Sequence, residues 1–227
     1  VYKNGKVQID SLSGNGMRLV FADTNGVLTT TGETYNPIFE SNNGTLRTTS
    51  GYDTANFVFG SPQMDRDGNT DHHSRMFFNK EKSAFRAGSD DIGAWNYDSL
   101  GRYSVAFGYR AKATKENSIA MGRQSSATSD HSNSIGSLSS ANGGQSAAIG
   151  YLAKVTGSNS YSLGRQAVVN GSEAYAIGNG AQASQSRSFA IGYNSWADAF
   201  NSFAIGGGAT TKGAESISIG IGTKAEG

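Results

Sequence analysis

The sequence predicts an all-β protein: a parallel β-roll of 14-residue coils in the second half, preceded by β-hairpins. From Ser104 onward, a small residue, an apolar residue and glycine recur with a 14-residue period. A unit of that length cannot hold a helix and return, whereas two short strands with tight turns fit. The first hundred residues lack this period and are rich in Asn-Gly pairs, which favour two-residue hairpin loops. Glycine is abundant (31 residues) but proline is not (2), and 10% of residues are aromatic, unlike a disordered linker.

Residues 1–100 are predicted to be a β-rich N-terminal cap or hairpin region. Asn-Gly pairs stand at 4–5, 15–16, 25–26 and 43–44. The stretch MRLVFADTNGVLTTT is the clearest hairpin, because β-forming residues flank the pair at 25–26. NFVFGS predicts another strand, and SRMFFNKEKSAFRAG predicts two strands that close through Asn79 to Lys82.

The aromatic residues of this region indicate a small core. They are Phe57, Phe59, Phe77, Phe78, Phe85, Trp95 and Tyr97. The region either covers the open first edge of the roll, which a solenoid must protect, or carries a receptor site. The sequence leaves both roles open.

Residues 101–227 form the predicted roll, and nine phase positions mark its coils. These are Ser104, Ser118, Ser132, Ser146, Ser160, Ala174, Ser188, Ser202 and Ser216. A glycine follows four residues after each, at 108, 122, 136, 150, 164, 178, 192, 206 and 220. Glycine supplies either a positive φ or the absence of a side chain where the chain turns.

Two strands per coil follow from the pattern around each glycine. Alanine or serine and then a large apolar residue precede it, as in Ala120 and Met121. Later in the coil, two small residues flank a variable one, as in Ala181, Gln182 and Ala183, which predicts a strand with one buried face. Coils stacked about 4.8 Å apart give a rod about 40 Å long.

One further column is bulky and apolar, and it predicts an interface. It contains Val105, Ile119, Tyr161, Tyr175, Phe189, Phe203 and Ile217, with Asn133 and Ala147 as exceptions. It shares strand parity with the Phe/Met/Ile column and opposes the small column, so two apolar stripes lie on one face. Contiguous exposed apolar stripes mark interfaces, and copies of the chain are expected to associate along this one. The alternative is a roll wide enough to hold these side chains inside.

The repeats NSIAMG, NSYSLG, RSFAIG and NSFAIG, each followed by A-x-A or a related pattern, resemble the head repeat of trimeric autotransporter adhesins, the YadA-like head. The resemblance covers residues 104–227 and implies a left-handed parallel β-roll, a homotrimer (intertwined or side by side) and adhesion at a bacterial surface. The coil SNSIGSLSSANGGQ departs from it, with Ser134 and Ser139 replacing alanines and Asn133 interrupting the bulky column. Within that resemblance, Ile119, Tyr161, Tyr175, Phe189, Phe203 and Ile217 are the expected trimer interface.

Charge and composition limit the function classes. The net charge is +1, from 19 basic and 18 acidic residues without long like-charged runs, and this argues against a nucleic-acid or anionic-membrane partner. There is no cysteine, so thiol catalysis, disulfides and thiolate metal sites are excluded. No stretch approaches the roughly 18 apolar residues of a membrane span, and we expect targeting and anchoring segments to lie outside this sequence.

A metal site is conceivable in the stretch DRDGNTD. Asp65, Asp67, Asn69 and Asp71 alternate there, and their oxygens are ligands that calcium prefers. The glycine is fourth rather than sixth and no bidentate glutamate follows, so a solvated turn competes with calcium. Zinc at the adjacent His72 and His73 is disfavoured because neighbouring side chains in a strand point apart.

No catalytic pattern is recognisable, and we expect a non-enzymatic protein without a cofactor. His131 shares its repeat position with Asn117, Gln145, Asn159 and Glu173, which indicates a turn residue rather than a base. No nucleophile-elbow or phosphate-loop signature occurs. The glycines at 178–180 and 206–208 fall on turns of the repeat.

The predicted function is adhesion by multivalent contact with a host cell-surface or extracellular-matrix protein or glycan. Variable outward positions are the candidate contacts: Trp196, Tyr193, Tyr151, Lys154 and Arg165. The predicted location is extracellular, on a bacterial cell or on an exposed fibre of a phage or tail-like particle. The alternatives are a receptor-binding tail fibre and a purely structural spacer.

Overall fold

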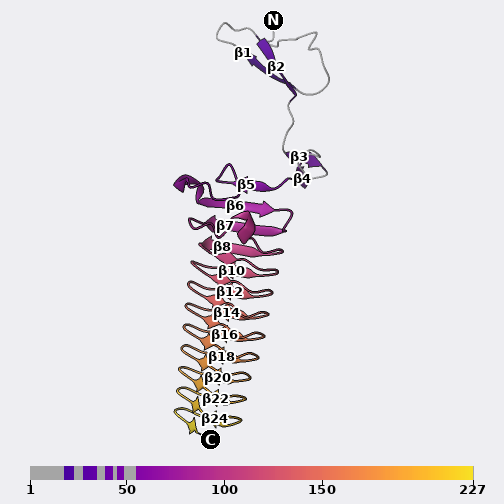
Figure 1. Ribbon diagram of the computed structural model, residues 1–227. Helices are drawn as coiled ribbons and strands as arrows, with labels where there is room; N and C mark the ends of the chain where they lie inside the picture. Colours follow the sequence, from indigo (N-terminus) through magenta and orange to yellow (C-terminus); the bar gives the residue numbers. More distant parts are fainter. Residues whose placement is uncertain (1–17, 23–27, 35–38, 43–44, 49–54, 227) are drawn as a thin grey trace. The chain divides into compact units, whose positions relative to one another are not determined.

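The computed structural model describes residues 18–22, 28–34, 39–42, 45–48 and 55–226. The chain divides into two units, Val1–Ala55 and Asn56–Gly227. Figure 1 shows the elements of each unit in sequence colours. Among the described residues, no helix is long and apolar enough to cross a membrane.

The first unit contains two antiparallel pairs. Strand β1 (Arg18–Ala22) pairs with β2 (Leu28–Thr34), which confirms the strands predicted on either side of the Asn-Gly pair at 25–26. Strand β3 (Phe39–Asn42) pairs with β4 (Thr45–Thr48). The four Asn-Gly pairs themselves, at 4–5, 15–16, 25–26 and 43–44, lie outside the described residues.

The second unit begins with an antiparallel segment whose strands match the predicted ones. Strand β5 (Phe57–Phe59) pairs with β6 (Ser74–Asn79), and β6 pairs with β7 (Ala84–Ser89). Two short 3₁₀ helices, η1 (Thr70–His72) and η2 (Tyr97–Ser99), lie in the connecting loops. Strand β7 then pairs in parallel with the first strand of the repeats, so this segment continues the same sheet.

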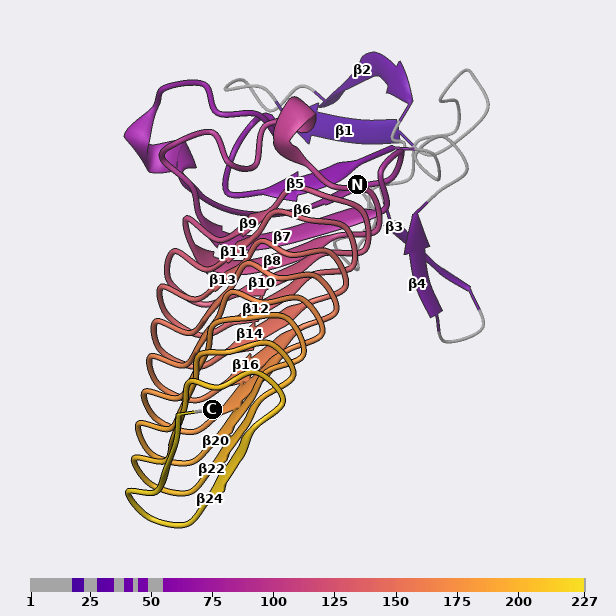
Figure 2. The same cartoon turned by 60° about the horizontal axis from the view of Figure 1, so that its bottom comes forward.

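The repeats form a parallel roll with two strands per coil, as predicted. One row of strands is β8 (Val105–Tyr109), β10 (Ile119–Met121), β12 (Asn133–Ile135), β14 (Ala147–Ile149), β16 (Tyr161–Leu163), β18 (Tyr175–Ile177), β20 (Phe189–Ile191), β22 (Phe203–Ile205) and β24 (Ile217–Ile219). The other is β9 (Lys112–Ala113), β11 (Ser126–Ala127), β13 (Ser140–Ala141), β15 (Lys154–Val155), β17 (Val168–Val169), β19 (Gln182–Ala183), β21 (Trp196–Ala197), β23 (Thr210–Thr211) and β25 (Lys224–Ala225). Figure 2 shows these rows on two sides of the stacked coils. Together with β5–β7 they make a 12-stranded and a 9-stranded sheet.

Every coil pairs with the next at a 14-residue offset, so equivalent residues stack directly. Phe189, for example, lies opposite Tyr175 on one side and Phe203 on the other. The interior between the sheets is narrow and filled mainly by alanine and serine, with valine at two positions, Val155 and Val169. It does not hold the bulky column, so the alternative of a wider roll is wrong.

The coil that departs from the family pattern, residues 132–145, keeps the same interior. Ser134 and Ser139 stand where alanine is usual, and their hydroxyl oxygens lie 2.7 Å apart in a buried hydrogen bond. The Ser139 hydroxyl donates to the Gly136 carbonyl at 2.9 Å, which leaves the Ser134 hydroxyl to donate to Ser139. Both hydroxyl protons are thus used in the interior.

The glycine column is required for both predicted reasons. Gly164 has φ +143°, and a Cβ there would overlap the backbone of Gly178 in the next coil. The turns also place non-glycine residues at positive φ, including His131 at 57°. This confirms the prediction that His131 is a turn residue. At the opposite turn, the phase serine caps the backbone: the Ser188 hydroxyl donates to the Gln185 carbonyl oxygen at 2.5 Å.

Side chains complete the first edge of the 9-stranded sheet. In the 9-stranded sheet, a carbonyl such as that of Ser125 accepts from an amide of the preceding coil, here the amide of Lys112. Strand β9 has no preceding strand in this sheet. The Ala113 carbonyl accepts from the Gly101 amide at 3.2 Å, and side chains supply further donors. The buried Trp95 indole Nε1 donates to the Ala111 carbonyl at 2.7 Å, and the Arg86 guanidinium donates to the Ala113 carbonyl at 2.7 Å. Within the predicted region 1–100, these contacts support a capping role for the part that belongs to the second unit, residues 56–100.

Arg86 occupies the alanine column, because it pairs in register with Ala106. Its guanidinium also donates to the Ser104 carbonyl and hydroxyl. The pKa of Arg86 falls to about 10 because burial disfavours the charged form, which still leaves it protonated at neutral pH. Here the step between phase positions, from Ala84 to Ser104, is longer than the period of the repeats, and the longer coil accommodates the side chain.

A buried aspartate organises the loop that carries Trp95. Asp90 accepts hydrogen bonds from the amides of Ala94 and Trp95, at 3.1 and 3.0 Å. The guanidinium of Arg75 lies 3.6 Å from its carboxylate, and both side chains are buried. The loop is thus fixed by a charge pair in which backbone amides bind the carboxylate, as a buried ion requires.

Candidate functional site

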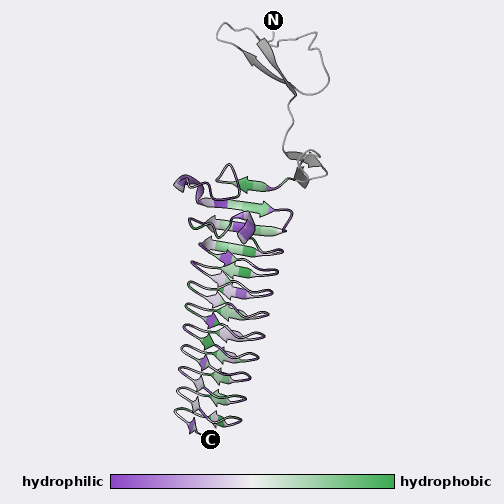
Figure 3. Cartoon of the chain, viewed as in Figure 1, coloured by the Kyte–Doolittle hydropathy of each residue, from purple (hydrophilic) through white to green (hydrophobic). Residues whose placement is uncertain are grey.

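The roll presents a continuous apolar face along the outside of its even-numbered strands, β8 to β24. These strands are coloured mostly green in Figure 3. We call the apolar face the two columns Val105, Ile119, Tyr161, Tyr175, Phe189, Phe203, Ile217 and Phe107, Met121, Ile135, Ile149, Leu163, Ile177, Ile191, Ile205, Ile219. Each of these side chains is at least partly exposed in the single chain. The alanine or serine between the two columns points inward and is buried. The prediction that the two apolar stripes lie on one face, opposite the small residues, is therefore confirmed.

Four aromatic rings of the apolar face form a stack. The ring centroids of Tyr161 and Tyr175 are 5.3 Å apart, those of Tyr175 and Phe189 4.9 Å, and those of Phe189 and Phe203 4.7 Å. The interplanar angles fall from 16° to 4° along the stack. The 14-residue register aligns these rings, which leaves one side of the stack available to another molecule.

The other exposed surface is polar and variable. We call the outer face the column Lys112, Ser126, Ser140, Lys154, Val168, Gln182, Trp196, Thr210, Lys224, together with the turn residues three positions before each. In each two-residue strand of this face the first residue points outward and the second points inward. In β21, for example, Trp196 is exposed and Ala197 is buried. Because only the inward residue packs in the roll, the outward one is free to vary from coil to coil.

These coils match a known family. A family model for the YadA head domain repeat matches residues 99–125, 113–139, 170–195 and 197–227. The repeat region of this chain belongs to the YadA head family. A comparison with curated proteins gives no match.

Membership of the YadA head family carries its general properties. YadA head domains are non-enzymatic adhesin domains of trimeric autotransporters, displayed on the bacterial cell surface, and the family implies a homotrimer. The expectations of a non-enzymatic protein and of a YadA-like fold are confirmed by this match.

The five predicted contact residues of the YadA head occupy the outer face but do not form one cluster. Tyr151 and Arg165 lie on neighbouring coils, with the Arg165 guanidinium 5.8 Å from the Tyr151 ring centroid. Lys154 follows on the coil of Tyr151. Tyr193 and Trp196 lie on a coil three steps away, about 14 Å along the roll. There the Trp196 indole donates to the Ser184 hydroxyl at 3.2 Å.

Three of the four predicted calcium ligands, Asp65, Asp67 and Asn69, accept hydrogen bonds within the chain. A carboxylate oxygen of Asp65 accepts from the Tyr97 amide at 2.6 Å, and the Asn69 side chain accepts from the Asp71 amide at 3.0 Å. Asp67 lies 2.5 Å from His72 Nδ1, and this hydrogen bond lowers the pKa of the Asp67 carboxyl. Across the part of the chain that the structure describes, no three histidine or acidic side chains are placed to hold a metal ion. The calcium site stays a prediction without geometric support.

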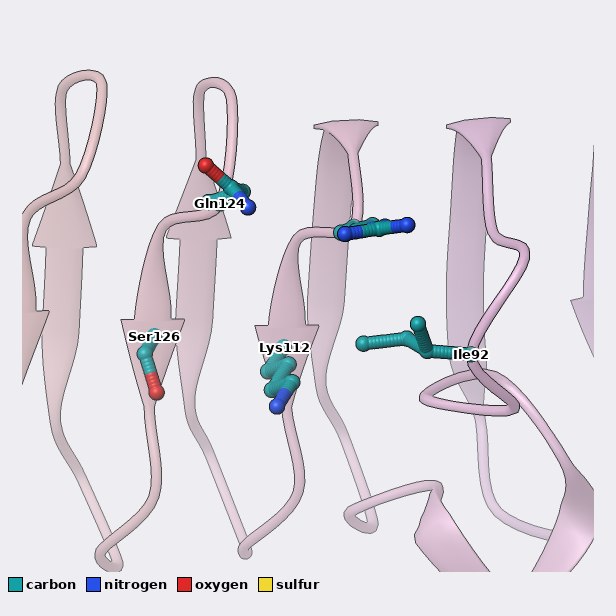
Figure 4. Close-up of a pocket in the computed structure, with 5 residues that line it drawn as sticks. Ile92, Lys112, Gln124 and Ser126 are labelled. Atoms are coloured by element: carbon teal, nitrogen blue, oxygen red, sulfur yellow. The ribbon is translucent and has the colours of Figure 1, made fainter.

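A shallow hollow beside the first coil was not predicted. It has a volume of about 270 Å³ and is lined by Ile92, Arg110, Lys112, Gln124 and Ser126. Figure 4 shows Lys112 and Ser126 on adjacent strands, with Ile92 extending toward them. Asp91 accepts two hydrogen bonds from the Arg110 guanidinium, which hold the pKa of this carboxyl well below its usual range. The guanidinium is therefore largely occupied within the chain.

Sequence reasoning also missed Arg86 and Trp95 as capping residues. A signal for the first was present: in SAFRAG, Phe85 and Gly88 stand at the bulky and glycine positions of a coil. The longer step to Ser104 hides this coil from a search at a fixed period. No pattern in the sequence indicates which carbonyl Trp95 binds.

Proposed function

We propose that this chain is the adhesive head of a homotrimeric surface protein that binds a host cell-surface or matrix ligand by multivalent contact. Three copies meet along the apolar face, with Ile119, Tyr161, Tyr175, Phe189, Phe203 and Ile217 at the interface. The outer face, with Tyr151, Lys154, Arg165, Tyr193 and Trp196, then remains exposed to ligand. The main support for this proposal is the continuous apolar face. Within the described residues, no other element of the chain covers its stacked rings.

The area and position of this face favour self-association. It extends over nine coils and its side chains remain exposed in the single chain, beyond what isolated surface apolar residues explain. The strand positions of the outer face, such as Lys154 and Trp196, lie on the other sheet from the apolar face, so association through the apolar face leaves them accessible. Three copies of a weak outer-face site on one rigid roll increase avidity by about 10² to 10⁴ where geometry allows.

The test is the solution mass of the full chain by light scattering, with adhesion measured in parallel. We expect a mass near three times the 23.7 kDa of one chain, and saturable binding to host cells or immobilised matrix. Phe189→Glu places a charge within the ring stack and should give a folded monomer with at least tenfold weaker adhesion. Gln182→Glu adds the same charge on the outer face and should leave the mass unchanged.

Two results would overturn the proposal. A wild-type monomer at micromolar concentration would remove the apolar face as an interface and avidity from the mechanism. A trimer that binds no host cell or matrix surface would identify the chain as a structural spacer.

A further inference from the structure

One coil of the roll differs from all others on its exterior. Coil 188–201 exposes three aromatic side chains away from the apolar face: Tyr193 (65% exposed), Trp196 (41%) and Phe200 (46%). The position of Phe200 holds a small or acidic residue in other coils, namely Glu116, Asp130, Gly144, Ser158, Ser172, Ser186 and Ala214. The position of Trp196 is otherwise never aromatic. The roll therefore does not require these rings.

The next coil lacks side chains beside Tyr193, and the backbone does not require this. At Gly207 φ is not positive, and an added Cβ would meet only the Tyr193 carbonyl, at 4.0 Å. At Gly208 nothing lies within 4 Å of an added Cβ, and equivalent positions carry side chains, as Gln124 does at φ 54°. The Gly208 amide donates to the Tyr193 carbonyl at 2.8 Å, so this bare backbone lies directly along Tyr193. We call Gly207 and Gly208 the glycine shelf.

The outer positions beside the shelf are polar but uncharged. In the preceding coil the equivalent outer positions hold Asn179, Gly180 and Gln182, and in the following coil Thr210 stands beside Trp196. The charged Arg187 is paired with Glu173 at 3.0 Å. Asp198 and Lys212 follow Trp196 and Thr210 by two positions, so the charges near the site are of both signs and favour no ionic ligand.

We propose that Tyr193, Trp196 and the glycine shelf form a binding site for a neutral saccharide; this inference rests on the proposed adhesive function and specifies its ligand. Tyrosine and tryptophan combine an apolar ring face with a polar edge, which suits the C–H face and hydroxyls of a pyranose. The amides of Asn179 and Gln182 and the hydroxyl of Thr210 supply donors and acceptors. The Cα atoms of Tyr193 and Trp196 are at most about 11 Å apart, a distance that two linked sugar rings span.

The glycine shelf admits the ligand edge-on to Tyr193. A side chain at position 207 would stand in the same column as Tyr193 on the adjacent coil and would cover its ring. In other coils this column tolerates large residues, including Tyr109 and Tyr151. Gly207→Tyr therefore fills the site without a conflict with the fold.

The experiment titrates the full chain with neutral oligosaccharides (maltotetraose, cellotetraose, chitotetraose and lacto-N-tetraose) and follows tryptophan fluorescence and heat of binding. Trp95 is buried in the cap, so a fluorescence change reports on Trp196. We expect saturable binding of at least one probe, and at least a tenfold loss of affinity in Gly207→Tyr. Ser137→Tyr makes the same kind of change in the same column on a distant coil and should leave affinity unchanged.

The outcomes separate this inference from the adhesive function itself. If the chain adheres to host cells but binds none of the four probes, or if Gly207→Tyr binds them as the wild type does, the saccharide site is wrong and adhesion stands. Binding of heparin in preference to the neutral probes also overturns it. A trimer that adheres to no surface overturns the proposed function instead.

Discussion

The coils of the roll and the cap that precedes them complete their backbone hydrogen bonds in different ways. Between coils, amides and carbonyls of adjacent chain segments bind each other, and the interior needs only alanine- and serine-sized residues. At the first edge of the 9-stranded sheet no preceding strand exists. There Trp95 and Arg86 donate to the Ala111 and Ala113 carbonyls, beside one backbone donor, the Gly101 amide. Stability in the roll is thus distributed over many small contacts, whereas in the cap it depends on a few large side chains.

The largest expected effect tests the cap. Trp95→Ala removes a fully buried ring and the donor to the Ala111 carbonyl, and should lower the free energy of unfolding by about 3–5 kcal/mol. Hydrogen exchange should rise first in the amides of the adjoining coil, such as Lys112 and Thr114. The chain's other tryptophan provides the control: Trp196→Ala, on the exposed outer face, should change stability by less than about 1 kcal/mol. Equal losses in both variants would refute the distinction between cap and roll.

A second prediction tests how narrow the roll interior is. Ala183 and Gln182 are neighbours on the two-residue strand β19, one buried and one exposed. Ala183→Leu forces a larger side chain between the two sheets and should destabilise the chain by about 1–3 kcal/mol in chemical denaturation. Gln182→Leu adds a similar side chain outside and should stay within about 0.5 kcal/mol of the wild type. An unchanged Ala183→Leu would mean that the interior can expand.

The smallest effect concerns pH at the junction of cap and roll. The pKa of Asp91 is lowered in the folded chain, chiefly by hydrogen bonds from Arg110, so the carboxylate adds stability above its unfolded pKa of about 3.9. That contribution disappears as the pH falls through the folded pKa. Asp91→Asn should therefore melt slightly below the wild type at pH 7, and the difference should begin to narrow as the pH falls below about 3.9. A melting difference that stays constant across this range would rule out the ionised pair as its source.

The same contrast explains which features the sequence predicts. Tyr175 has equivalents in the other coils, and each stands next to a small residue that points inward. Because side chains alternate along a strand, the sequence places Tyr175 on the outside of the roll. In the same way the glycine at 164 predicts its own turn. The role of Trp95 depends on a contact made once, with the carbonyl of Ala111, and on a loop fixed by Asp90. Features that occur once in a chain leave no periodic signal.

The candidate outer-face site also has one part that the sequence predicts and one part that only the structure shows. The sequence places Trp196 outward because its neighbour Ala197 belongs to a buried column. That Gly207 and Gly208 are not needed by the turn becomes visible only from the space around them in the folded chain. The repeat separates them from Gly206, because only the column of Gly206 is glycine in every coil, but it does not show that the space beside Tyr193 is open.

The 14-residue register has a consequence for how such a chain varies in length. Because paired residues in successive coils are offset by the same number of positions, removal of one whole unit, for example residues 146–159, joins two equivalent backbones without shifting any column. Recombination between similar gene segments would shorten or extend the roll in discrete steps of about 4.8 Å. An insertion or deletion that is not a whole multiple of the period would instead move every later side chain out of phase. The length of the roll can thus be reset genetically while its faces are preserved.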